Sequence, residues 1–305
     1  MLPARLPLAI DTRRLRSFDG TEIAYHVTEA PYPGAPWIVL ASGLAGGSVV
    51  WRGQIDYLRD RHRFLTWDYR GLGASERPRP ARPGAYSVES HVRDLAAVLA
   101  AERIERAALW GWSTGVQVAI EAAARLPLAR PGAGLARSLV LVNGTSGRPL
   151  DALTALRPLR AAILPFLEVF RRAHAFGPLA HRPIGRREAA AWLERLGLIG
   201  GDVDPLTLAE LTAAVGSLDL DAFLQNLLAF GAHDATDALP SIDVPALVIA
   251  GDTDPLAARG AAKELARRIP GAELLLIRGG AHCAPIEFPD LVGLRIERFY
   301  RDRGL

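Results

Sequence analysis

The stretch Leu109-Trp110-Gly111-Trp112-Ser113-Thr114-Gly115 decides how the rest of the chain is interpreted. A short apolar run with strand character at 106–110 leads into it, and a helix-prone segment at 116–126 leads out. The stretch is therefore a G-x-S-x-G motif between a strand and a helix. Its glycines let backbone pass close to backbone in a sharp turn, so that a serine hydroxyl is held exposed on a strained corner. The pattern predicts that Ser113 is a nucleophile.

Outward from this motif, short apolar runs alternate with helical patterns. Runs without polar alternation are typical of strands that are covered on both faces. Ser87 is expected to be the N-cap of a helix whose apolar side chains repeat at helical spacing. Asp19-Gly20 favours positive φ and predicts a hairpin between 14–18 and 22–27. The other expected strands are 37–42, 63–68, 138–142, 244–250 and 273–277, and the expected helices include 51–59, 257–268 and 290–301.

This order of elements predicts an α/β fold with a doubly wound, mostly parallel sheet and helices on both faces. The alternation stops between 144 and 237, where only helical patterns occur, the clearest at 220–228 and a less regular one at 155–166. We therefore expect a core formed by 1–143 and 238–305, with 144–237 inserted as a helical cap or lid. In such sheets ligands bind at the carboxyl ends of the strands, where Ser113 lies.

A serine hydroxyl needs a base within hydrogen-bond reach and a group that orients the base. Of the seven histidines, only His282 lies in a loop just after a late core strand. The preceding strand offers Asp252 and Asp254; we favour Asp254 as the orienting carboxylate and expect Asp252 to stabilise the turn through its own backbone. No carboxylate follows the strand at 138–142 directly, because Asn143 stands there.

Taken together, these segments resemble the α/β-hydrolase superfamily, in its serine-nucleophile, esterase- or lipase-like branch with a helical cap. The order Ser113, Asp254, His282 is the order that the family uses. The glycine-rich loop at 43–47 is similar to its oxyanion loop, and 68–75 is similar to its D-x-R-G-x-G-x-S segment. We expect Asp68 and Arg70 of that segment to hold loops in place.

The resemblance also implies further site residues. It makes the backbone N–H groups of Leu44 and Thr114 the expected oxyanion hole. Two positions depart from the family pattern: Ser42 stands where many members have histidine at the start of the oxyanion loop, and Trp112 stands where histidine often precedes the nucleophile. We place both of these residues at the substrate pocket.

Composition and charge exclude several classes of protein. The chain has 36 basic and 33 acidic residues, and its arginines are dispersed, so we expect no nucleic-acid partner. The single cysteine, Cys283, excludes a multi-cysteine metal site, and we expect neither metal nor cofactor. The first ten residues lack the continuous apolar region of a signal peptide, and no run approaches a membrane span, which predicts a cytoplasmic protein. The oligomeric state stays open.

The expected function is a carboxylesterase or lipase-like hydrolase that acts on a small-molecule ester of small to medium acyl or aryl type. A serine at 113 argues against the dehalogenases and epoxide hydrolases of the superfamily, which use aspartate there. The alternatives are a carbon–carbon bond hydrolase or a cofactor-free perhydrolase with the same triad, and thioesterase and acyltransferase activities also stay open. A non-catalytic small-molecule receptor on the same fold is the alternative from another class.

Overall fold

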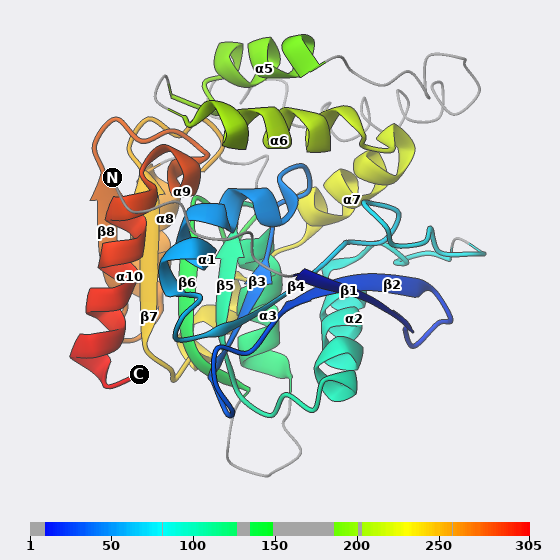
Figure 1. Ribbon diagram of the computed structural model, residues 1–305, viewed down its shortest axis with the longest axis horizontal. Helices are drawn as coiled ribbons and strands as arrows, with labels where there is room; N and C mark the ends of the chain where they lie inside the picture. Colours follow the sequence, from blue (N-terminus) through cyan, green and yellow to red (C-terminus); the bar gives the residue numbers. More distant parts are fainter. Residues whose placement is uncertain (1–9, 81, 127–134, 149–185, 201–202, 258) are drawn as a thin grey trace.

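The computed structural model describes residues 10–80, 82–126, 135–148, 186–200, 203–257 and 259–305. They form an eight-stranded sheet in the order β1-β2-β4-β3-β5-β6-β7-β8 (Figure 1). β2 pairs antiparallel with β1 and with β4, and all remaining pairs are parallel. The strands are β1 Ile10–Arg16, β2 Glu22–Thr28, β3 Trp37–Ala41, β4 Arg63–Trp67, β5 Ala107–Trp112, β6 Ala136–Val142, β7 Ala246–Gly251 and β8 Glu273–Ile277. The predicted doubly wound, mostly parallel sheet is confirmed.

Helices cover both faces of this sheet. α2 and α3 pack on one face together with α8, while α1 and α10 cover the other. The helices are η1 Gly47–Trp51, α1 Arg52–Leu58, α2 Val88–Ala101, α3 Gly115–Arg125, α5 Arg186–Arg195, α6 Pro205–Gly216, α7 Leu220–Ala232, η5 Thr236–Ser241, α8 Arg259–Arg268, α9 Ala284–Glu287 and α10 Pro289–Arg303. Because both faces are covered, every residue of β5 and β7 is buried, as the absence of polar alternation predicts.

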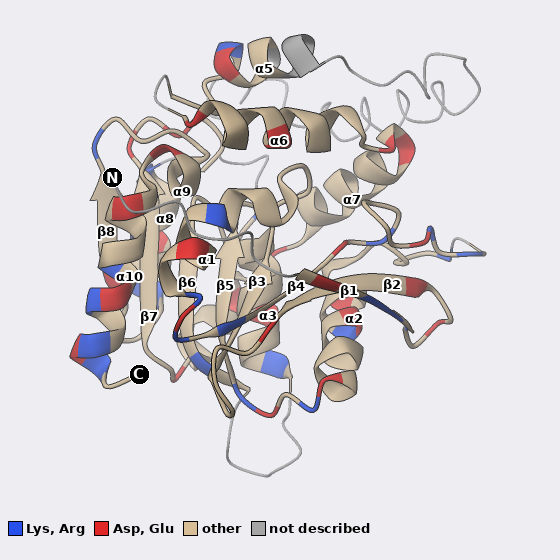
Figure 2. Cartoon of the chain, viewed as in Figure 1, with Lys and Arg blue, Asp and Glu red and all other residues tan. Residues whose placement is uncertain are grey.

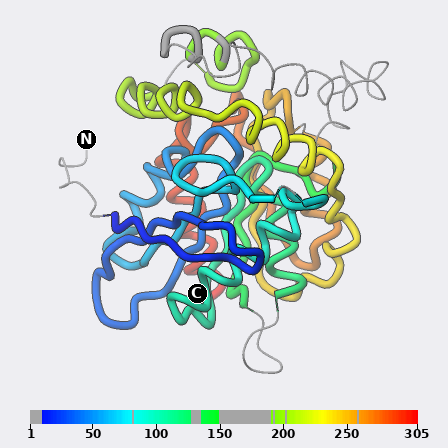
Figure 3. The backbone as a smooth tube through the Cα atoms, turned by 90° about the vertical axis from the view of Figure 1, so that its right-hand side faces the viewer, coloured from blue at the N-terminus to red at the C-terminus, as the bar shows by residue number. Residues whose placement is uncertain are grey.

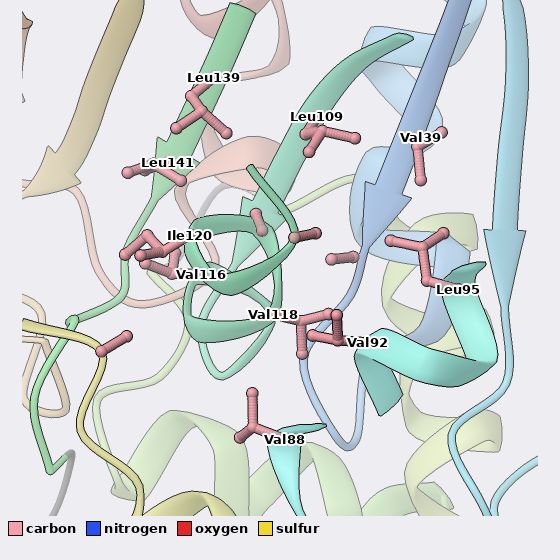
Figure 4. Packing of buried hydrophobic residues seen from close by; sticks show 14 of the residues in the cluster. Val39, Val88, Val92, Leu95, Leu109, Val116, Val118, Ile120, Leu139 and Leu141 are labelled. Carbon is pink, nitrogen blue, oxygen red and sulfur yellow. The ribbon is translucent and has the colours of Figure 1, made fainter. Parts of the chain in front are cut away.

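The core on the α2–α3 face shows how the patterns of helix and strand meet. Val88 and Val92 of α2 point toward α3, and Leu95 lies near Val39 of β3 (Figure 4). Val116 and Ile120 of α3 lie toward the strands. All of these side chains are buried. Their helical spacing therefore corresponds to one buried face of each helix.

Local signals in the sequence hold at the ends of elements. β1 and β2 form the predicted hairpin, in which Arg16 pairs with Glu22 and Gly20 has φ of +87°. The Ser87 side chain accepts a hydrogen bond from the Ser90 N–H and caps α2 as predicted. The strand of the motif is longer than predicted, since Gly111 and Trp112 still pair with β6.

Three helices, α5, α6 and α7, lie above the carboxyl ends of the parallel strands in both views, and we refer to them as the overlying helices (Figures 1 and 3). Ion pairs and hydrogen bonds connect α7 and the residues next to its two ends to the core. Arg77 forms ion pairs with Asp219 and Asp221, the Asn226 side chain accepts from His91 Nε2 at 2.8 Å, and His233 Nε2 lies 3.0 Å from Glu121. The helical pattern predicted at 155–166 lies outside the described residues.

Among the residues that the structure describes, no helix is both long enough and apolar enough to cross a membrane.

Candidate active site

Ser113 occupies a sharp turn between β5 and α3. Its φ is +57°, in the left-handed region that side chains rarely adopt. The two glycines of the motif are required by space: a Cβ at Gly115 would lie 2.0 Å from the Ala41 carbonyl oxygen, and one at Gly111 would lie 2.7 Å from the Gly115 oxygen. The sequence therefore places a strained serine at the carboxyl end of the central strand, as the motif predicts.

Ser113, His282 and Asp254 form one hydrogen-bonded chain. His282 Nε2 lies 2.9 Å from Ser113 Oγ, and His282 Nδ1 lies 3.0 Å and 3.1 Å from the two carboxylate oxygens of Asp254. His282 and Asp254 are both buried. With its Nδ1 hydrogen directed at the carboxylate, the imidazole keeps Nε2 free to accept the serine proton. The three residues come from the ends of three different strands, and the structure brings them together.

Asp254 is held in its ionised form. Burial alone would raise its pKa, but hydrogen bonds from His282, the Ala257 N–H and Asn143 together lower the pKa below its usual range. Asp254 Oδ1 accepts from the N–H groups of Leu256 at 2.8 Å and Ala257 at 3.0 Å. The carboxylate is therefore fixed and charged at neutral pH, which suits it to orient an imidazole.

Asn143 is a functional candidate that the sequence reasoning missed. Its Nδ2 donates to Asp254 Oδ2 at 2.7 Å and to the carbonyl oxygen of Ala281 at 3.0 Å. It thereby joins the end of β6 to the acid and to the loop that carries His282. The available signal was a polar residue directly after a buried strand at the ligand-binding edge of the sheet.

The two N–H groups predicted for the oxyanion hole face no competing acceptor. In the part of the chain that the structure describes, the backbone N–H groups of Leu44 and Thr114 donate no hydrogen bond. Both residues line the same cavity as Ser113 and His282. Thr114 is also the N-cap of α3, where the helix dipole favours negative charge. The arrangement can stabilise an anion beside the serine hydroxyl.

This cavity has a volume of about 230 Å³ and lies between the sheet and the overlying helices. Most of its described wall is apolar, and the side chains from the overlying helices and from the loop after α5 are Leu193, Leu198, Leu211, Val215, Phe223 and Leu227. Trp112, predicted at the substrate pocket, lies on the wall. Ser42, also predicted at the pocket, is buried and does not lie among the described residues of the wall, which Leu44, Ala45 and Gly46 of the following loop do line.

Trp112 supports two parts of the site. Its indole N–H donates to the His282 carbonyl oxygen at 3.0 Å. Its ring packs beneath the glycine-rich loop at 43–47, so closely that a Cβ at Gly43 would lie 2.7 Å from it and one at Gly46 would lie 2.6 Å from it. The glycines of this loop are thus needed for the approach to the tryptophan ring.

The other acidic and basic candidates have structural contacts. Asp68 accepts from the Ala74 N–H at 2.9 Å, and Arg70 is fully buried between Asp94 and Asp19. Both hold loops, as expected, although they do not pair with each other. Asp252 accepts from the Gly279 N–H at 2.7 Å, so it joins two loops. This contact differs from the prediction, in which Asp252 stabilises the turn through its own backbone.

Within the described ranges, no three His, Cys, Asp or Glu side chains gather into a group that could hold a metal ion.

A hydroxyl, an imidazole and a carboxylate presented from the ends of a mostly parallel, doubly wound sheet define the class of serine α/β hydrolases. The chain belongs to the alpha/beta hydrolase family, whose model matches residues 38–293. The family resemblance seen in the sequence is therefore confirmed, and the protein is a hydrolase on this fold.

Individual relatives agree with this assignment. The chain is 28% identical over 272 residues to RutD of Klebsiella pneumoniae subsp. pneumoniae, named as a carbamate hydrolase, with 87% of this chain and 91% of the relative covered. It is similar to the crystal structure of an enol-lactonase from Burkholderia xenovorans, with a TM-score of 0.69, 27% identity and coverage of 95% and 100%. A thermophilic esterase from Thermogutta terrifontis has the same fold, with a TM-score of 0.70, 20% identity and coverage of 96% and 98%.

Proposed function

We propose that this hydrolase cleaves a carboxylic ester of small to medium acyl or aryl type through an acyl-enzyme. The observation that carries the proposal is the continuous chain from Asp254 through His282 to Ser113, whose hydroxyl opens into an apolar cavity. An activated serine beside an apolar wall suits a neutral acyl compound better than a charged one.

In this mechanism, Ser113 Oγ attacks the acyl carbon while its proton passes to His282 Nε2. The tetrahedral oxyanion accepts hydrogen bonds from the N–H groups of Leu44 and Thr114. His282 then donates the proton to the leaving alkoxide, and the acyl group stays on Ser113. Water, deprotonated by the same imidazole, releases the acid. Loss of one preorganised oxyanion donor typically costs about 3–4 kcal/mol of transition-state stabilisation.

The insertion 144–237 acts in this proposal as a cap that shapes the acyl pocket. Its support is the set of apolar side chains from α5, α6 and α7 on the cavity wall. The cavity of about 230 Å³ suits a short or aromatic acyl group and leaves little room for a long chain. We therefore expect a preference for acetyl to hexanoyl or benzoyl esters.

Carbamate hydrolysis is a second candidate, favoured by the 28% identity to RutD over 87% of this chain. A carbamate offers the serine the same kind of carbonyl carbon, flanked by nitrogen and oxygen. The acid, base and oxyanion donors would have the same roles. Relative rates on matched esters and carbamates distinguish the two candidates.

The test is hydrolysis of p-nitrophenyl esters from acetate to palmitate, together with p-nitrophenyl N-methylcarbamate. Wild type is compared with Ser113→Ala and with a control, Ser241→Ala, whose hydroxyl donates to the Ala238 carbonyl oxygen away from the site. We expect activity that peaks at a short chain and falls by roughly 10⁶-fold in Ser113→Ala only. A higher kcat/KM for the carbamate than for every ester favours the second candidate, and equal rates in wild type and Ser113→Ala would refute both.

A further inference from the structure

A second cavity lies at the amino ends of the parallel strands, whereas Ser113 lies at their carboxyl ends. It has a volume of about 440 Å³, and its wall includes Trp37 at the start of β3, Arg137 near the start of β6, and Tyr300 of α10. We call it the basal pocket. Ser113 follows the other end of β5, so the two sites are separated by the length of that strand, roughly 16 Å. No step of the proposed mechanism uses the basal pocket.

The charge on the wall of the basal pocket is unbalanced. Three guanidinium groups, those of Arg61, Arg137 and Arg301, line it with a single side-chain carboxylate, that of Glu297, so the side chains of the described wall carry a net charge of +2 (three positive, one negative). Figure 2 shows basic residues along α10 toward its C-terminal end, with acidic residues between them, and the basic residues of this helix are all arginines. Excess positive charge at a concave surface attracts anions.

Arg137 is the guanidinium without a partner. Arg61 lies 2.6 Å from Glu297, and Arg301 lies 4.0 Å from Asp302. Among the residues that the structure describes, no carboxylate lies within ion-pair distance of Arg137, and its side chain makes no hydrogen bond. A partly buried guanidinium without an acceptor is costly unless a ligand or water supplies one.

His62 also lines the pocket, and its pKa is affected by the nearby positive charges. Burial is the main cause that lowers its pKa to about 4, and the charges of Arg61 and Arg137 contribute in the same direction. His62 is therefore neutral at pH 7 and adds no charge to the pocket, where Arg61 is paired with Glu297 and Arg137 has no carboxylate partner among the described residues. A bound anion would offset the positive charge of the pocket and raise the pKa of this imidazole.

We propose that the basal pocket binds a small organic carboxylate, with its anionic group on Arg137 and its apolar body against Trp37, Leu58 and Tyr300. The planar fork of a guanidinium matches a carboxylate in two parallel hydrogen bonds. The volume is that of a small-molecule site and far exceeds one simple ion. The proposal is independent of the proposed function, because it uses neither Ser113 nor the acyl cavity.

The test measures binding of sodium benzoate to the full chain by isothermal titration calorimetry at low ionic strength. Benzamide serves as the neutral isostere and sodium sulfate as the simple anion. The variants are Arg137→Gln and, as a charge-matched control, Arg278→Gln, an exposed arginine just after β8 at the other edge of the sheet. Ser113→Ala is included to separate this site from the acyl cavity. Imidazole NMR of His62, assigned with His62→Gln, gives a local readout.

We expect benzoate to bind wild type, Ser113→Ala and Arg278→Gln alike, and Arg137→Gln about tenfold to a hundredfold more weakly, as loss of a charge-assisted hydrogen bond implies. The titration midpoint of His62 should move to higher pH with benzoate. Unchanged affinity in Arg137→Gln, or an unmoved His62, would overturn the proposal. Equal binding of benzamide would show that charge is not recognised, and equal binding of sulfate would show an adventitious ion only; either result also overturns it.

Discussion

Asn143 adopts φ of +47°, a left-handed conformation that asparagine tolerates better than most residues. From this position its side chain reaches both the Asp254 carboxylate and the Ala281 carbonyl oxygen. At the scale of the single residue, two requirements therefore coincide: a backbone that turns sharply after β6 and an amide that fixes the acid. We infer that Asn143 is a positioning residue for the proposed triad.

Asn143→Gly tests this role, because glycine keeps the left-handed backbone and removes only the amide. We expect kcat/KM on the best ester to fall about tenfold or more, since hydrogen bonds to charged groups are worth about 1.5–3 kcal/mol. KM should change less than kcat, because the amide is hydrogen-bonded to Asp254 and to the Ala281 carbonyl oxygen. Steady-state kinetics checks this, with urea denaturation to confirm a stable fold.

Asn143→Ala is the companion variant. It loses the same amide and adds backbone strain of roughly 1–2 kcal/mol at positive φ. It should therefore match the glycine variant in kinetics and be less stable. Full activity in the glycine variant would show that Asp254 needs no support from β6.

Single residues also show the limit of sequence reasoning. Ser113 could be predicted because its motif is local, and His282 and Asp254 because each follows a late strand. The contact of Asn143 with Asp254 spans 111 positions in the sequence and depends on how β6 and β7 pair in space. A local pattern could indicate that Asn143 lies at the right edge, but not that its amide faces the acid.

At the scale of elements, α3 approaches the end of β3 at Gly115 with no room for a side chain. A Cβ there would meet the backbone oxygens of Ala41 at 2.0 Å and Ser42 at 2.8 Å. Backbone atoms cannot rotate away as a flexible side chain does. The crossing of α3 and β3 therefore depends on glycine.

We expect Gly115→Ala to destabilise the protein by about 1–3 kcal/mol or more, because α3 or the end of β3 must shift. The shift would also displace Leu44 and lower the proposed esterase activity. The control is Gly260→Ala in α8, where the added methyl meets nothing within 4 Å, so a gain of up to roughly 1 kcal/mol is expected. Urea denaturation measures both, and a Gly115→Ala protein as stable as wild type would contradict the steric argument.

Element positions could be predicted well because each rests on local periodicity. The strands at 37–42 and 273–277 and the last helix at 290–301 are all present, with ends displaced by two residues at most. The short helix α9 was missed, since four residues carry too little pattern. What the periodicity could not give is which strands are neighbours, for example that β3 lies between β4 and β5.

At the scale of the whole molecule, buried neutral histidines couple stability to pH. His91 is fully buried between Tyr69 and Phe230, hydrogen-bonded to Asn226 and near Asp94 and Arg70. Burial lowers its pKa from the usual 6.5 to about 4. Between these values the unfolded chain binds a proton that the native protein does not, so stability rises with pH across this window.

We therefore expect the free energy of unfolding to decrease as the pH falls from about 6.5 to about 4, with His91 contributing about 3 kcal/mol of the loss. Asp254 acts at lower pH, because its pKa is below the usual carboxyl range. Urea denaturation at several pH values measures the slope. In His91→Gln, which keeps a side-chain donor for Asn226, the slope should be smaller, and an unchanged slope would exclude His91 as the source.

The position of Trp112 has a consequence for how this hydrolase can acquire new substrates. One indole donates to the His282 carbonyl oxygen, fills the space beneath the glycine-rich loop at 43–47 and forms part of the cavity wall, so its replacement would disturb the proposed base and the proposed oxyanion hole together. Leu211, Val215 and Phe223 face the same cavity and contribute only apolar surface. Substitutions in α6 and α7, in evolution or in the laboratory, can therefore change the substrate range. Substitution of Trp112, next to the nucleophile, would disturb the site itself.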